Sequence, residues 1–171
     1  MYMSCYLVKV AYFVFLFSTM SAQVDFGQVC GNNVRVRLKS NTKSPIVHEC
    51  NKNYVVSIVG DEGDYYKIQA TDDRPLYVYS RYICDKHSTK LTAKLDGKNV
   101  NVRIGPNQES AVVKKLSSQD IKLWPKQDYK KCIAIKPTKD MYYYISKQFV
   151  KKISNEEALV FLKENDKRML N

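Results

Sequence analysis

The segment GNNVRVRL at residues 31–38 returns as GKNVNVRI at residues 97–104, a spacing of 66 residues. The glycine, one asparagine, both valines and an arginine stay in step between the two segments. Two further pairs of segments repeat at spacings of 66 and 67 residues: SPIVHEC at 44–50 with SAVVKKL at 110–116, and YVYSRYI at 77–83 with YISKQFV at 144–150. Such a repeat predicts two copies of one small structural unit.

Each copy has the residue pattern of short β-strands. Apolar side chains alternate at Val34 and Val36, and again at Tyr66, Ile68 and Ala70. Turn-forming segments separate these runs: GDEGD at 60–64, TDDRP at 71–75, GPN at 105–107 and KPTKD at 136–140. Short strands at close spacing predict antiparallel barrels or sandwiches.

The segment VNVRIGPN at residues 100–107 resembles the opening signature of bacterial SH3-like domains, in which an Asn-Val-Arg strand runs into a Gly-Pro turn. The family's other landmarks follow in order: a valine-rich strand at 111–116, an apolar strand ending near a glycine at 54–60, an aromatic pair at Tyr65 and Tyr66, and a terminal strand with a short helical turn at 77–83. The resemblance covers residues 28–152. It implies an all-β fold of two tandem small SH3-like β-barrels, at residues 28–85 and 93–152.

Both ends of the chain carry further signals. The first 22 residues have the order of parts of a cleavable secretory signal: Lys9, the apolar run VAYFVFLF at 10–17, and small residues up to Ala22. The apolar run is about half the length of a membrane-spanning helix, and Cys5 precedes it, unlike the cysteine of a lipoprotein. A buried N-terminal helix would instead need a polar face. We therefore expect a secreted or periplasmic protein without a stable membrane anchor.

A short helix is expected at residues 154–168, after the second barrel. Ser154 and Glu157 have the spacing of a capping box. Ala158, Leu159 and Leu162 would share one face, which favours packing on the second barrel over a tail that binds a partner or a membrane.

The chain is basic, with a formal net charge of +11. A positive field favours acidic polymers such as wall polymers, anionic lipid or lipopolysaccharide. The lysines are scattered, as on an ordinary solvated surface, and Lys147, Lys151 and Lys152 alone approach a cluster. Nucleic acid is not an expected partner, because it would conflict with the export signal.

Four cysteines follow the signal, and an even count in an exported protein suggests disulfides. The ends of an SH3-like barrel meet in space, so the resemblance favours a bond between Cys30 and Cys84. The main rival is Cys30 with Cys50. With the bond between Cys30 and Cys84, Cys50 and Cys132 would form a pair between the barrels or remain two buried thiols.

No enzymatic activity, cofactor or metal site is expected. The spacings include no Cys-x-x-Cys, and His48 and His87 lie far apart. His48 and Cys50 share one face of a strand, but no third group completes a catalytic set, and a disulfide or core cysteine is the favoured interpretation. Wall hydrolases that carry these barrels usually add a separate catalytic domain, for which this chain has no room.

Aromatic side chains are the expected ligand-binding groups, since tyrosine offers a flat apolar ring with a polar tip. The predicted positions are Tyr65, Tyr66, Tyr77 and Tyr79 in the first copy, and Trp124, Tyr129, Tyr142 and Tyr143 in the second. About half of them are expected to fill the core, because alternate residues of a strand point inward.

The resemblance implies a recognition module, commonly for peptidoglycan peptides or other envelope components. The expected function is therefore binding of cell wall or of an envelope partner through the tandem barrels. The alternative is a periplasmic inhibitor or immunity protein that binds and neutralises a secreted toxin or hydrolase.

Overall fold

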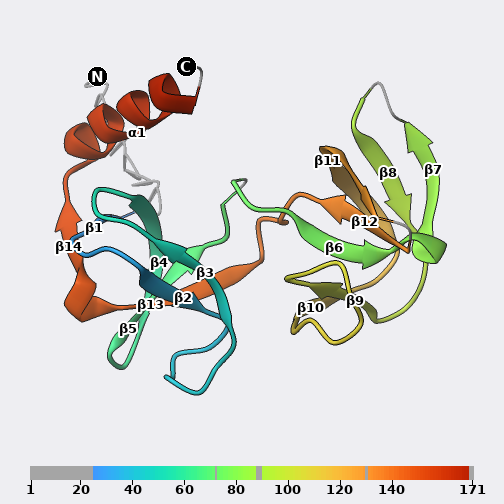
Figure 1. The fold of residues 1–171 in the computed structure, drawn as a ribbon, viewed down its shortest axis with the longest axis horizontal. Coiled ribbons are helices and arrows are strands. Elements are labelled where there is room, and N and C mark those ends of the chain that lie inside the picture. Colours follow the sequence, from blue (N-terminus) through green and yellow to red (C-terminus); the bar gives the residue numbers. More distant parts are fainter. Residues whose placement is uncertain (1–24, 72, 88–89, 130, 170–171) are drawn as a thin grey trace, which may run out of the picture.

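A computed structural model of the chain describes residues 25–71, 73–87, 90–129 and 131–169. The predicted secretory signal at 1–22 lies outside the described residues. The molecule has two lobes joined by two crossing segments (Figure 1). Each lobe is built on an antiparallel sheet of seven strands, so the all-β prediction is confirmed. In neither sheet do the two outermost described strands pair with each other, and both sheets are therefore open.

The first lobe combines the beginning and the end of the chain. Its strand order is β14-β1-β4-β5-β13-β2-β3. The strands are β1 (Asp25–Val29), β2 (Val34–Arg37), β3 (Ile46–Cys50), β4 (Val55–Glu62), β5 (Tyr65–Gln69), β13 (Tyr142–Ser146) and β14 (Val150–Ile153). A 3-10 helix, η2 (Lys147–Phe149), joins β13 to β14.

The second lobe is contiguous in sequence. Its strand order is β10-β9-β6-β12-β11-β8-β7. The strands are β6 (Leu76–Tyr79), β7 (Ile83–His87), β8 (Thr92–Leu95), β9 (Val100–Arg103), β10 (Val112–Leu116), β11 (Gln119–Tyr129) and β12 (Cys132–Ile135). The 3-10 helix η1 (Ser80–Tyr82) joins β6 to β7.

This strand pairing departs from the contiguous units expected at residues 28–85 and 93–152. β6 and β7 end the first sequence copy, yet β6 pairs with β12 and β9 in the second lobe. Conversely, β13 of the second copy pairs with β5 and β2, and β14 pairs with β1. The two copies have thus exchanged their terminal strands.

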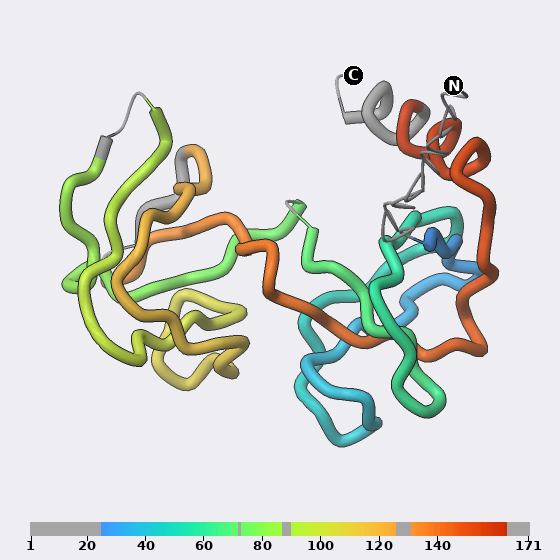
Figure 2. Tube along the Cα trace, turned by 180° about the vertical axis from the view of Figure 1, so that it is seen from behind, coloured from blue at the N-terminus to red at the C-terminus, as the bar shows by residue number. Residues whose placement is uncertain are grey.

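Two connecting segments carry the chain between the lobes. The described residues 70, 71 and 73–75 belong to one segment and residues 136–141 to the other, and the backbone N–H of Ala70 donates to the carbonyl of Met141 at 3.0 Å. Figure 2 shows the two segments crossing between the lobes. Pro75 precedes β6 directly and has no N–H to donate to a strand ladder. After Pro75 the chain continues as β6 in the second lobe.

The sequence repeat is also a structural repeat. Asn33 and Asn99 both adopt a left-handed backbone, with φ of 53° and 55°. Arg37 Nη1 donates to the Ser44 carbonyl at 2.8 Å, and Arg103 Nη1 donates to the Ser110 carbonyl at 2.7 Å. These matched details show that both copies build the same local structure.

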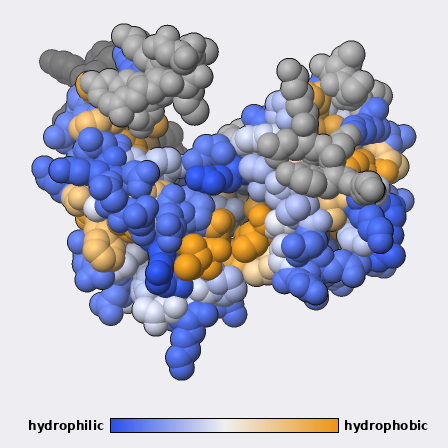
Figure 3. Space-filling view, in the orientation of Figure 1, coloured by the Kyte–Doolittle hydropathy of each residue, from blue (hydrophilic) through white to orange (hydrophobic). Residues whose placement is uncertain are grey.

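The core runs through both lobes. Most buried residues of the two sheets belong to one hydrophobic cluster, which includes Leu76 and Met141 at the ends of the connecting segments. The surface seen in Figure 3 is largely hydrophilic, and an apolar patch lies near its middle, between the lobes. Scattered surface lysines account for much of this polar character.

The C-terminal helix α1 (Asn155–Met169) confirms the predicted capping box. The Ser154 N–H donates to Glu157 Oε2 at 2.9 Å, and the Glu157 N–H donates to Ser154 Oγ at 3.2 Å. Two expectations about this helix are wrong. It contacts β1 and β4 of the first lobe, and its buried face centres on Ala158, whereas Leu159 is 56% exposed. None of the described helices is long and apolar enough to span a membrane.

Neither predicted disulfide is present. Cys30, Cys50, Cys84 and Cys132 are all free thiols. Cys30 directly follows β1 in the first lobe, whereas Cys84 lies on β7 in the second. The exchange of terminal strands therefore places the favoured pair in different lobes. In the rival pair, Cys50 is buried on β3 while Cys30 is exposed.

Candidate ligand-binding pockets

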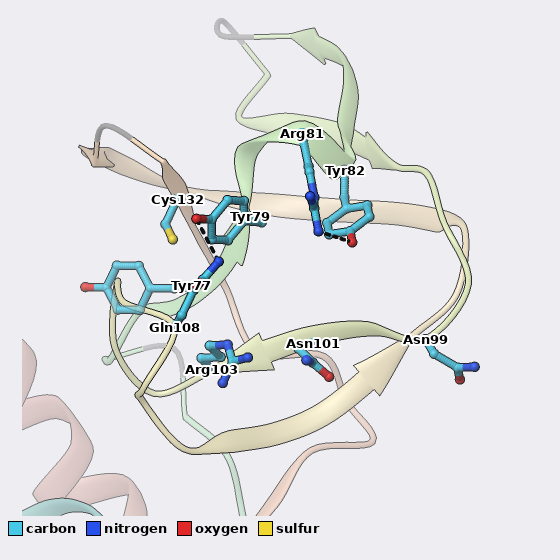
Figure 4. A pocket seen from close by; sticks show the side chains of 9 residues that line it. All are labelled: Tyr77, Tyr79, Arg81, Tyr82, Asn99, Asn101, Arg103, Gln108 and Cys132. Carbon is cyan, nitrogen blue, oxygen red and sulfur yellow. Dashed lines mark hydrogen bonds between the residues drawn. The ribbon is translucent and has the colours of Figure 1, made fainter.

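The second lobe contains an aromatic pocket with a volume of about 290 Å³. Its walls come from β6 and η1 on one side and from β9 and the loop after it on the other (Figure 4). The lining residues are Tyr77, Tyr79, Arg81, Tyr82, Asn99, Asn101, Arg103, Gln108 and Cys132. We call this the tyrosine pocket.

Hydrogen bonds and ring contacts hold the aromatic wall of the tyrosine pocket. Gln108 Nε2 donates to the Tyr79 hydroxyl at 2.9 Å. Arg81 Nη2 donates to the Tyr82 hydroxyl at 2.8 Å. The Arg81 guanidinium also lies 4.7 Å from the Tyr82 ring centroid and 5.4 Å from that of Tyr79. These contacts position the guanidinium between two rings, where cation–π attraction stabilises it.

The opposite wall of the tyrosine pocket is polar and cationic. One N–H of Arg103 donates to the Ser110 carbonyl, and a guanidinium has five N–H donors in all. The Asn101 Oδ1 atom is buried and has no hydrogen-bond partner. The described lining includes no carboxylate. The pocket can therefore receive an anionic group at its arginines and a flat or apolar group on the tyrosines.

A second pocket of about 360 Å³ lies in the first lobe. It is lined by Gly31, Asn32, Asn33, Val34, Arg35, Arg37, Thr42, Tyr65, Ser146, Gln148 and Phe149. Its walls come from β2 and the turn before it, and from the end of β13 with η2. We call this the arginine pocket, because Arg35 and Arg37 are its charged groups.

The structure divides the eight predicted ligand-binding residues. Tyr77 and Tyr79 line the tyrosine pocket, and Tyr65 lines the arginine pocket. Trp124 packs against the cluster formed by Tyr77, Cys132 and Ala134. The prediction thus found residues of both pockets without distinguishing them.

The remaining predicted residues lie elsewhere. Tyr143 is 2% exposed and belongs to the core. Tyr66 and Tyr142 are half-buried on β5 and β13, with Lys147 5.4 Å from the Tyr66 ring and Lys67 4.3 Å from the Tyr142 ring. The side chain of Tyr129 lies outside the described residues.

Sequence reasoning missed the polar half of the tyrosine pocket. The missed polar residues are Arg81, Arg103 and Gln108, and Tyr82 of the aromatic wall was missed as well. Their signal was the repeat itself, because Arg103 is the arginine that both copies keep in step and Arg81 lies in the repeated terminal segment. The choice of aromatic side chains passed over the two arginines and Gln108, and it also omitted Tyr82.

His48 lies on β3 and lines neither pocket. Both ring nitrogens are buried without a hydrogen-bond partner, as is the Tyr143 hydroxyl. The ring contacts Tyr143 and Tyr54 edge to face, at centroid distances of 6.2 and 6.5 Å. Burial raises the pKa of the nearby Cys50 thiol to about 12, an environment that opposes formation of a nucleophilic thiolate.

Among the described residues, no group of His, Cys, Asp and Glu side chains is arranged to hold a metal ion. No family model, curated protein or solved structure matches the chain. Functional assignment therefore depends on the fold and on the two pockets.

Proposed function

We propose that the protein is an exported, non-catalytic binding protein that recognises cell wall peptidoglycan or another envelope component. The observation that carries the proposal is the tyrosine pocket, which places three tyrosines and two arginines around one cavity. Aromatic rings with nearby donors suit sugars and peptides, and arginines suit the carboxylates of peptides.

The two lobes are best interpreted as tandem SH3-like units. The resemblance of residues 100–107 to the family's signature supports this interpretation, as do the short antiparallel strands of each lobe. A 3-10 turn directly before a terminal strand, present as η1 before β7 and as η2 before β14, is a further point of agreement. The order of parts in residues 1–22 supports export.

The first test is a pull-down of residues 23–171 on purified peptidoglycan sacculi and, in parallel, from a periplasmic extract, at low and moderate salt. We expect retention on sacculi that survives moderate salt. Tyr79→Ala combined with Tyr82→Ala should weaken retention by about tenfold or more, since aromatic groups in a pocket dominate binding energy. Tyr142→Ala, which removes a half-buried tyrosine outside both pockets, is the matched control and should bind like the parent.

Two results would contradict the proposal, the first by excluding wall binding and the second by excluding the tyrosine pocket as the binding site. In the first result, the protein is not retained on sacculi and a single protein from the periplasmic extract co-purifies with it, which would favour the inhibitor or immunity function. The other is equal retention of the parent and the Tyr79/Tyr82 variant, which would place the binding surface outside the tyrosine pocket.

A further inference from the structure

The two pockets occupy equivalent positions in the sequence repeat. Residues on β2 and in the loop after it match residues on β9 and in its loop at a spacing of 66, and residues of β13 and η2 match those of β6 and η1 at a spacing of 67. The matched lining pairs are Asn33 and Asn99, Arg35 and Asn101, Arg37 and Arg103, Thr42 and Gln108, Tyr65 and Cys132, Ser146 and Tyr79, Gln148 and Arg81, and Phe149 and Tyr82. Two sequence-distant cavities thus have one architecture.

Each pocket has two arginines, but the second arginine comes from a different wall in each lobe. Arg37 and Arg103 are equivalent and hold the same bond to a loop carbonyl. The second arginine of the tyrosine pocket is Arg81 on η1, where the arginine pocket has Gln148. The second arginine of the arginine pocket is Arg35 on β2, where the tyrosine pocket has Asn101. An amide therefore faces each second arginine across the cavity in both lobes.

The aromatic group is also retained. Phe149 occupies in the arginine pocket the place that Tyr82 has in the tyrosine pocket, and it is 40% exposed. The described lining of the arginine pocket includes no carboxylate. Glu49 pairs with Arg35 at 3.7 Å, but both side chains are about half exposed, and a surface ion pair of this kind is weak enough for a ligand to replace.

We propose that both pockets bind carboxylate groups, so that the chain is bivalent toward a polymer that carries carboxylates at intervals. A guanidinium binds a planar carboxylate through two parallel N–H donors, and the amide of each pocket adds further donors or acceptors. The natural polymer is the peptide-bearing cell wall if the proposed function holds. Occupation of two sites by one polymer multiplies the apparent affinity without any new contact.

The test exchanges residues between the lobes. Arg81→Gln and Arg35→Asn each introduce the residue that the other copy carries at the equivalent position, so the fold should tolerate both. Lys94→Gln, which removes one exposed positive charge on β8 outside the pockets, is the matched control. Binding is measured by calorimetry with a monomeric peptidoglycan fragment, its carboxyl-amidated form, and poly-L-glutamate.

We expect two fragments to bind each parent chain and one to bind each single variant. On poly-L-glutamate and on sacculi, each single variant should bind about tenfold or more weakly, because avidity is lost. The double variant should lose binding, and Lys94→Gln should resemble the parent. The amidated fragment should bind neither pocket.

Three outcomes would overturn the inference: a parent stoichiometry of one, an Arg35→Asn variant that binds like the parent, or equal binding of the amidated fragment. Failure of the proposed function is distinguishable from these. In one such case the parent binds poly-L-glutamate but neither sacculi nor fragments, and both Arg35→Asn and Arg81→Gln weaken that binding. That result disproves wall binding and keeps the bivalent carboxylate site. A parent that binds none of the probes disproves both.

Discussion

His48 shows how a single residue can make stability depend on pH. Burial lowers the pKa of its imidazole, an effect opposed by Asp73 and reinforced by Arg74. The unfolded chain takes up the proton near pH 6.5, whereas the folded chain resists it. Proton uptake by His48 therefore favours the unfolded state. The free energy of unfolding keeps its full His48 contribution above pH 6.5 and decreases as the pH falls below that value.

Replacement of this imidazole should remove the pH dependence. We expect His48→Phe, which keeps a ring beside Tyr54 and Tyr143, to reduce the loss of stability between about pH 7.5 and pH 5. Urea unfolding at both pH values measures the change in the midpoint. His87→Phe changes the other histidine and serves as control. Equal pH dependence of the parent and His48→Phe would show that another group controls the acid response.

At the scale of one element, the capping box should govern the local stability of α1. Ser154→Ala removes the oxygen that accepts the Glu157 N–H and should cost about 1 kcal/mol of helix stability. Native-state hydrogen exchange should therefore accelerate in the first turn of α1 and remain unchanged in β9. Lys163→Ala, an exposed position on the same helix, should change neither. Uniform acceleration across the molecule would contradict this local role.

The elements also show what sequence patterns can predict. Alternating apolar residues located strands such as β2 and β9, and the Ser154–Glu157 spacing located the start of α1, because these features depend on neighbours in sequence. The buried face of α1 depends on which strands it contacts, and β1 and β4 accept the small Ala158. The aromatic residues of the sequence predicted part of each pocket, whereas prediction of the arginines would have required a comparison of the two copies.

At the scale of the whole molecule, the second lobe is an insertion in the first. Sequence repeats could predict two similar units, but β6 and β13 carry equivalent segments, so nothing in the pattern assigns each to its sheet. The pairing is decided by long-range contacts such as β5 with β13. The free Cys30 and Cys84 follow from the same arrangement.

This arrangement predicts which fragments fold. Residues 75–136 contain every strand of the second lobe and should fold alone, with dispersed amide signals in NMR spectra. Residues 25–70 joined by a short glycine linker to 141–169 should also fold, because Ala70 and Met141 are already in hydrogen-bond contact.

Residues 28–85 provide the control fragment. That fragment lacks β13 and β14, and it should remain largely unfolded or associate to replace them. A well-dispersed monomeric spectrum from residues 28–85 would show that β6 can complete the first sheet and would contradict the insertion.

The insertion also sets an order of events during synthesis. A chain that emerges from its N-terminus presents β1 to β5 first, but their sheet lacks β13, which lies between β5 and β2, until residues 142–146 have emerged. The last strand of the second lobe ends at Ile135, so this lobe can fold while β1 to β5 still lack their partner strand β13. The part of the chain made first is therefore the last to become native, and its exposed strands need protection from premature association for the whole interval.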